Sequence, residues 1–96
     1  MQSFIDLFSR KITLTEERKS HILERLEMIN QENKIKETLK NPDLLKRSIS
    51  SEEVVIYYKH YPKTPVTSKH LAVVVNTKES FIISAYFTDR IKKGEL

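Results

Sequence analysis

The spacing of apolar residues changes along the chain, and its first half has the period of helices. Between residues 16 and 30 apolar side chains recur at helical spacing, which predicts an amphipathic helix: Ile22, Leu23, Leu26 and Ile29. Thr15 precedes this segment and is a favourable N-cap. Residues 31–40 predict a second, shorter helix. It ends before Pro42 because proline restricts the residue before it and has no N–H to donate.

Beyond residue 43 apolar and polar positions alternate, which is the pattern of strands. Four strands are predicted, at residues 44–50, 54–61, 69–76 and 81–88. Their short connections favour antiparallel neighbours. Helices followed by strands predict an α+β fold, with two helices (the long one first) packed on one face of a four-stranded antiparallel sheet.

The remaining segments are short, so the chain is expected to form a single domain over residues 1–96. Residues 1–11 begin with apolar side chains and are expected to form an N-terminal packing arm. Ile12 and Leu14 alternate with threonines, which indicates a short edge strand. Residues 89–96 form a basic tail that is expected to leave the sheet.

The lengths of the two hairpin turns predict which residues pair. The first hairpin places His60 opposite His70, and a turn at residues 77–79 places Val75 opposite Phe81. The face covered by the helices is then predicted to hold Val55, Tyr57, Leu71, Val73, Val75, Phe81, Ile83 and Phe87. The other face is predicted to hold Val54, Ile56, Tyr58, His60, His70, Val74, Ile82, Ser84, Tyr86 and Thr88.

Composition narrows the classes of function. The chain has 17 Lys and Arg against 13 Asp and Glu, a net charge of +4 that permits a polyanionic partner. It has no cysteine, which excludes disulfides, thiolate nucleophiles and zinc–sulfur sites and fits a reducing cytoplasm. A single glycine excludes phosphate-binding loops of the Walker and dinucleotide types. No apolar run approaches the length of a bilayer span, so no membrane contact of that kind is expected.

Three histidines are the side chains whose ordinary pKa lies nearest neutrality. His21 lies at the border of the first helix, and Arg25, four residues later, is expected to be its neighbour on the same helical edge. It could act as a general acid or base while the guanidinium holds a phosphate, or it could simply cover the edge of the core. His60 and His70 could share a metal, but no third ligand is evident. We therefore expect neither a metal nor another cofactor.

The segment from Tyr57 to Tyr61 is the densest aromatic and basic stretch of the chain. Tyrosine rings can stack on bases and lysines can neutralise phosphate, although tyrosine also suits strands and lysine keeps a sheet end soluble. Further basic and hydroxyl side chains are expected at the same end of the sheet, where they would form a rim suited to a phosphodiester: Lys69, Thr88, Arg90, Lys92 and Lys93.

Four sequence motifs, in this order of elements, carry a family resemblance. They are His-Ile-Leu-Glu-Arg at 21–25, Asn-Pro-Asp at 41–43, Tyr-Tyr-Lys at 57–59 and Ala-Tyr-Phe-Thr-Asp-Arg-Ile-Lys-Lys-Gly at 85–94. Over residues 12–94 the chain resembles small phage and bacterial domains of the barnase–EndoU–colicin–RelE-like nuclease superfamily. The resemblance implies metal-independent RNA cleavage by a toxin-like domain. It also implies RNA as substrate and an antitoxin or immunity protein as partner.

The resemblance also implies roles for individual residues. His21 becomes an acid or base, Tyr58 a second proton-transfer or stacking group, and Thr88 a hydroxyl contact to phosphate. The basic residues would bind substrate and offset charge on the phosphorane: Arg25, Lys59, Lys69, Arg90, Lys92 and Lys93. Leu26 stands where similar domains carry a second histidine. The alternative is therefore a non-catalytic RNA- or protein-binding module that keeps the nuclease fold.

An edge strand and the apolar arm at Phe4–Phe8 could each support a homodimer.

Overall fold

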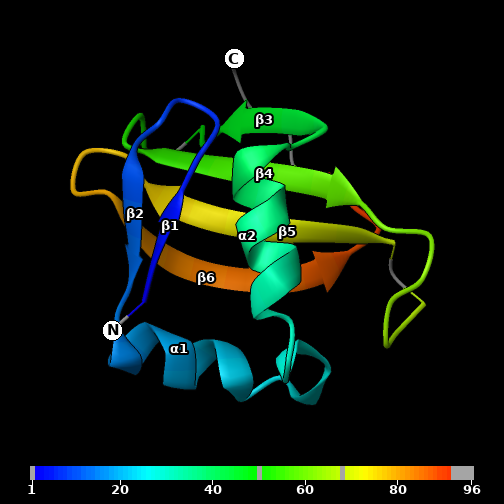
Figure 1. Cartoon of the computed structure of the whole chain (residues 1–96). Coiled ribbons are helices and arrows are strands. Elements are labelled where there is room, and N and C mark those ends of the chain that lie inside the picture. The colour runs from blue at the N-terminus through cyan, green and yellow to red at the C-terminus, as the bar shows by residue number, and fades with distance from the viewer. Residues whose placement is uncertain (1, 50, 68, 92–96) are drawn as a thin grey trace.

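The computed structural model describes residues 2–49, 51–67 and 69–91. The described residues form two α-helices and a short 3₁₀ helix, which lie beside a curved sheet (Figure 1). The elements in chain order are β1 (Gln2–Ile5), β2 (Lys11–Leu14), α1 (Glu16–Leu23), the 3₁₀ helix η1 (Leu26–Met28), α2 (Glu32–Lys40), β3 (Leu44–Arg47), β4 (Val54–His60), β5 (His70–Asn76) and β6 (Phe81–Thr88).

The sheet differs from the predicted one. Within the described residues it has six strands in the order β1-β2-β6-β5-β4-β3. Strands β3 to β6 form an antiparallel meander, but β2 pairs in parallel with β6 through Thr13 and Phe81. The prediction of a four-stranded, wholly antiparallel sheet is therefore wrong. The α+β class is confirmed, with two α-helices among the described residues.

The two additional strands come from the segment expected to be a packing arm and an edge strand. β1 and β2 form a hairpin in which Phe4 pairs with Ile12. β2 is not an edge, because β1 covers one side of it and β6 the other. β1 has only four residues, too few for alternation to distinguish a strand from an arm. Phe4, Ile12 and Leu14 are buried in the core, which explains the apolar start of the chain.

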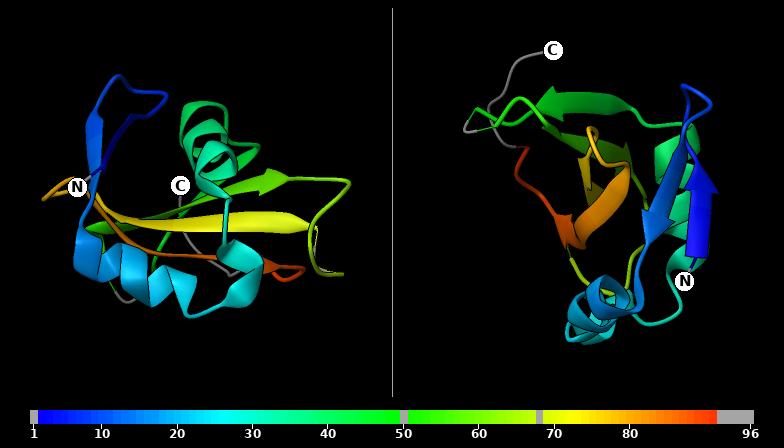
Figure 2. Two further views of the ribbon diagram at one scale, coloured as in Figure 1. Left: turned by 60° about the horizontal axis from the view of Figure 1, so that its bottom comes forward. Right: turned by 90° about the vertical axis from the view of Figure 1, so that its left-hand side faces the viewer.

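The sheet is bent toward the side on which α2 packs. In Figure 2 the β1–β2 hairpin and α2 stand on the same side of the four-strand meander. α2 packs on β4 and β5 and against β1, while α1 and η1 pack along β6. We call the face that α2 covers the inner face and the opposite face the outer face.

The main core lies between α2 and the inner face. Tyr57, Leu71 and Val73 are fully buried there, as predicted, and they pack with Ile35 and Leu39 of α2. A second, smaller apolar cluster lies on the outer face. It consists of the buried residues Ile56, Tyr58 and Ala72 and the half-buried residues Leu44, Val74 and Tyr86.

The first helix is shorter than predicted. α1 ends at Leu23, and the chain then passes through an extended residue, Arg25, into η1. The segment buries Met28, whereas Leu26 and Ile29 are exposed although their spacing resembled a core stripe. The prediction that His21 and Arg25 lie along one helical edge is therefore wrong, because the helix does not continue between them.

The register of the central hairpin is confirmed. β4 and β5 pair Tyr57 with Val73 and His60 with His70. The predicted β5–β6 register is wrong, because Val75 pairs with Ile82 and not with Phe81.

Two local features shift the β5–β6 register. The turn between these strands extends to Ser80, which has a positive φ of 57°. A bulge beside Val74 and Val75 then leaves Ile83 as the additional residue in β6. Ile82 consequently enters the core, whereas Phe81 and Ile83, predicted to be covered, are half-buried.

No helix in the described part of the chain is long and apolar enough to cross a membrane.

Candidate functional site

Two cross-strand rows on the outer face contain Tyr58 and Thr88, two of the residues predicted to act on a substrate. One row contains Leu44, Tyr58, Ala72 and Tyr86, and the other contains His60, His70 and Thr88. Because residues two apart on a strand share a face, the rows lie side by side. The second row lies at the end of the sheet where the β4–β5 hairpin turns.

The His60–His70–Thr88 row contains two adjacent imidazoles. Their ring centres are 5.2 Å apart and the rings meet edge to face. The His60 side chain is exposed, whereas Nδ1 of His70 is buried without a hydrogen-bond partner. The Thr88 hydroxyl donates to the carbonyl of Arg90 and accepts from its N–H, at 3.1 and 3.0 Å. Thr88 therefore shapes the end of β6 as well as lying beside the imidazoles.

Lys69 and Arg90 lie at the same end of the sheet. The Lys69 N–H donates to the Asp89 carboxylate at 2.9 Å, which ties the start of β5 to the end of β6. Both basic residues are exposed, as the predicted rim requires. Lys92 and Lys93, which were expected to join them, lie outside the described residues.

Lys59 is directed away from this rim. Its Nζ donates to the carbonyl of Asn41 at 3.0 Å and lies 3.8 Å from Asp43, so it holds the corner between α2 and β3. Its position alternates with those of Tyr58 and His60 along β4, which places it on the inner-face side. Lys59 thus lies apart from Lys69 and Arg90.

Arg25, two residues beyond the end of α1, reaches round β6 to the outer face. The guanidinium carbon of Arg25 lies 5.4 Å from the centre of the Tyr86 ring, a cation–π contact. Burial raises the pKa of the Tyr86 hydroxyl, and the Arg25 charge partly offsets this effect. Arg25 can make the contact because α1 has already ended, which leaves its backbone extended and its side chain free to cross the strand.

His21 lies in the last turn of α1 and is about half exposed. Its Nδ1 is 3.2 Å from Glu24 Oε2. A carboxylate that accepts from Nδ1 fixes the imidazole tautomer and leaves Nε2 as an acceptor. Glu24 was not among the predicted site residues, although its spacing of three from His21 on a predicted helix was a usable signal.

Tyr58 is on the predicted face but is not accessible. Its side chain is 0% exposed and packs with Ile56 and Ala72 in the outer cluster. Its immediate role in the described structure is packing.

A buried polar network on the inner face was not predicted from the sequence. Asp6 accepts hydrogen bonds from the Tyr57 hydroxyl at 2.7 Å, from Arg10 Nε at 3.1 Å, and from the N–H groups of Phe8 and Arg10 at 3.0 and 2.9 Å. The Arg10 guanidinium also donates to the Tyr57 hydroxyl at 3.0 Å. The network fixes the β1–β2 turn against β4.

The network shifts the pKa of two of its members. Burial raises the pKa of Asp6, but the Tyr57 hydrogen bond, the two N–H donors and the Arg10 charge together hold it below its ordinary value of 3.8. Burial and the neighbouring Asp6 carboxylate raise the pKa of Tyr57 to about 12. Asp6 is therefore ionised and Tyr57 neutral at pH 7, which lets the hydroxyl donate to the carboxylate.

No group of three His, Asp or Glu side chains in the described ranges is arranged to hold a metal ion. Comparisons with protein-family models, curated proteins and solved structures found no significant match to this chain.

Proposed function

We propose that the chain binds RNA on the outer face of its sheet and cleaves it by attack of the ribose 2′-hydroxyl, without a metal. The observation that carries the proposal is the contact of Arg25 with Tyr86. It brings a fixed positive charge from the end of α1 to the face that holds His60, His70 and Thr88. A cation and a π-face together are suited to a phosphate and its attached base.

His21 is the proposed general base. Glu24 holds Nδ1 and leaves Nε2 to accept the proton of the 2′-hydroxyl. The 2′-oxygen then attacks the adjacent phosphorus and the bond from phosphorus to the 5′-oxygen breaks. A protonated imidazole of the His60–His70 pair supplies the proton for that oxygen. The products are a 2′,3′-cyclic phosphate and a 5′-hydroxyl, and Arg25 offsets charge on the phosphorane between them.

Lys69 and Arg90 extend the proposed RNA path to the end of the sheet. Both are exposed and lie beside the imidazole row. Cations that contact phosphates release counterions, so they give affinity without sequence preference. An antitoxin or immunity partner and a cytoplasmic site of action remain predictions, made from the resemblance and from the cysteine-free sequence.

The second candidate is an RNA- or protein-binding module that does not cleave. The complete burial of Tyr58 favours this candidate, because a side chain predicted to transfer a proton does not reach the surface. Under this proposal the outer face still binds RNA through Arg25, Lys69 and Arg90.

Two substitutions distinguish these candidates. With labelled mixed-sequence RNA, we expect His21→Ala to lower the cleavage rate by about 100-fold and leave affinity within about twofold, because a base acts only in the reaction. Arg25→Gln should lower both. Lys36→Gln, on the exposed side of α2, is the control and should change neither. Equal loss of affinity and cleavage in His21→Ala would contradict the catalytic role, and binding without cleavage by the unchanged chain would favour the second candidate.

A further inference from the structure

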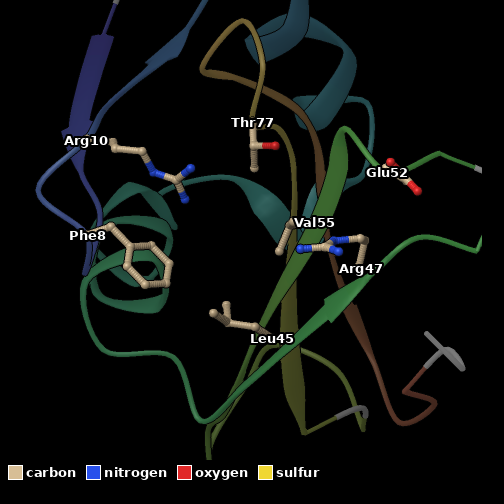
Figure 3. A pocket seen from close by; sticks show the side chains of 7 residues that line it. All are labelled: Phe8, Arg10, Leu45, Arg47, Glu52, Val55 and Thr77. Atoms are coloured by element: carbon tan, nitrogen blue, oxygen red, sulfur yellow. The ribbon is translucent and has the colours of Figure 1, made fainter. Parts of the chain in front are cut away.

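A cavity of about 350 Å³ lies on the inner-face side, between the β1–β2 turn and β3 (Figure 3). Its volume is at the lower end of the range for small-molecule sites. It is separate from the outer-face residues proposed to act on RNA. The residues that line it are Phe8, Arg10, Leu45, Arg47, Glu52, Val55 and Thr77.

Two guanidinium groups point into this cavity from opposite sides, Arg10 from the β1–β2 turn and Arg47 from the end of β3 (Figure 3). Arg47 has no ion pair with any described residue, and Glu52 lies at the rim beyond it. The charge of Arg47 is not balanced by an ion pair within the described residues, and Arg10, although paired with Asp6, also directs its guanidinium into the same space, so an anion placed between the two is favoured. Guanidinium groups bind carboxylates with paired N–H donors.

The Arg10 side is held in place before any ligand arrives. Nε and Nη2 of Arg10 are bound to Asp6 and to the Tyr57 hydroxyl, and the Asp6 side chain is 0% exposed. No described residue binds its Nη1, which leaves two N–H donors for a ligand. A side chain that is already held in its binding conformation loses little conformational entropy when a ligand binds, so the affinity is higher.

The rest of the lining is apolar and aromatic. The Phe8 ring lies 4.9 Å from the Arg10 guanidinium carbon and is more than half exposed. Leu45 and Val55, on neighbouring strands, present half-buried aliphatic side chains to the same space. A ligand that is only an anion would leave these surfaces in contact with water, whereas an aromatic body would cover them.

We propose that this cavity binds a small aromatic carboxylate. The carboxylate lies between Arg10 and Arg47, and the ring packs against Phe8, Leu45 and Val55. The proposal is independent of RNA binding, because it rests on the inner-face side of the sheet.

The test is calorimetric titration of the purified chain with benzoate and 1-naphthoate. Two further compounds each carry one half of the expected recognition: 1-naphthamide has the aromatic ring without the charge, and inorganic phosphate has the charge without the ring. We call them the partial ligands. We expect a carboxylate to bind at one site, with each partial ligand at least about tenfold weaker. Equal binding of 1-naphthamide would reduce the site to an apolar pocket, and equal binding of phosphate would make it an anion site; either result overturns the proposal. Failure of both carboxylates to bind at millimolar concentration also overturns it.

A pair of neighbouring substitutions places the binding in this cavity. Arg47→Gln should weaken binding by about tenfold, because it removes one of the two charged donors. Lys46→Gln is the matched control, since Lys46 precedes Arg47 on β3 and its side chain faces the opposite side of the sheet. Equal loss in both variants would indicate attraction to the general surface charge and would contradict the assignment. Unchanged thermal unfolding of both variants confirms that neither effect comes from loss of the fold.

Discussion

Asp6 is the buried residue on which most of the local polar structure depends. Its carboxylate accepts from two N–H groups in its own turn and from side chains of Arg10 and Tyr57. A buried acceptor of this kind stabilises the fold only while its donors are present, because an unpaired polar group costs about 1–3 kcal/mol. The same residue therefore joins the β1–β2 hairpin to β4 and positions Arg10 at the inner-face cavity.

We expect Asp6→Asn to lower the free energy of unfolding at pH 7 by about 2 kcal/mol. The substitution removes the negative charge of the carboxylate that accepts hydrogen bonds from Arg10 and Tyr57. The pKa of Asp6 is below its ordinary value in the folded chain. Its stabilising effect is therefore complete above the ordinary carboxyl pKa and is lost as the pH falls through the lower, folded-state value. Denaturant unfolding at pH 7 and at stepwise lower pH measures the difference between the two proteins.

Glu79→Gln is the control for this experiment, since Glu79 is exposed in the turn between β5 and β6, and it should change stability by less than about 0.5 kcal/mol. A gap between the wild type and Asp6→Asn that stays constant down to the lowest pH would contradict the assigned pKa.

At the residue scale, a contact could be predicted from the sequence where a regular strand pairing determines which residues face each other. His60 and His70 could be paired because a hairpin ladder repeats. The contact of Asp6 with Tyr57 could not be predicted, because it joins residues 51 apart through the geometry of a turn. Arg25 and Tyr86 were both visible in the sequence, but their contact depends on where α1 ends.

At the scale of elements, α1 is a short helix whose start is better defined than its end. Thr15 caps it, with the hydroxyl accepting from the Arg18 N–H at 3.2 Å, as predicted. The first turn carries Glu16 and Glu17, which the helix dipole favours. Its end could not be read from apolar spacing, because Leu26 and Ile29 keep that spacing after the chain has left the helix.

Removal of the cap should destabilise α1 and so loosen the segment that carries His21 and Arg25. We expect Thr15→Ala to cost about 1 kcal/mol of unfolding free energy, since the Arg18 N–H loses its acceptor. Thr15→Ser keeps a hydroxyl and should retain most of the stability. Ser20→Ala, an exposed change within the same helix, is the control. Thermal unfolding of the three variants makes the comparison, and an equal loss in Thr15→Ala and Thr15→Ser would contradict the capping role.

In the strands, alternation predicted regular pairing correctly but did not predict a bulge. β4 and β5 pair as predicted because no insertion interrupts them. In β6 the bulge at Ile83 changes which residues face the core. The bulge could not be predicted from alternation, because residues 81–83 are all apolar and give no sign of which side chain faces the core. Ile82 is buried for this reason, although it was assigned to the other face.

For the whole molecule, the bent six-stranded sheet separates two surfaces with different chemistry. The inner-face side holds α2, the Asp6 network and the small cavity. The outer face holds the two imidazoles, Thr88 and the Arg25–Tyr86 contact. β1 was predicted as a packing arm and β2 as an edge strand, and the turn between them supplies one wall of the cavity through Phe8 and Arg10.

The proposed RNA path predicts a salt dependence for the whole molecule. If Arg25, Lys69 and Arg90 contact three phosphates of a single strand, the logarithm of affinity should fall with the logarithm of salt with a slope of about −2. Lys69→Gln should reduce the slope by about 0.7, whereas Lys36→Gln should leave it unchanged. Fluorescence anisotropy of a labelled oligoribonucleotide over a salt series measures these slopes. A flat response would remove RNA as the partner.

Cleavage of RNA in the presence of EDTA, compared with a strand of the same sequence in DNA, tests the central claim most directly. We expect the purified chain to cut the RNA in EDTA and to leave a 2′,3′-cyclic phosphate, whereas the DNA strand should stay intact because it has no 2′-hydroxyl to attack. Cutting of both strands, or cutting of RNA that stops on addition of EDTA, would contradict the proposed mechanism.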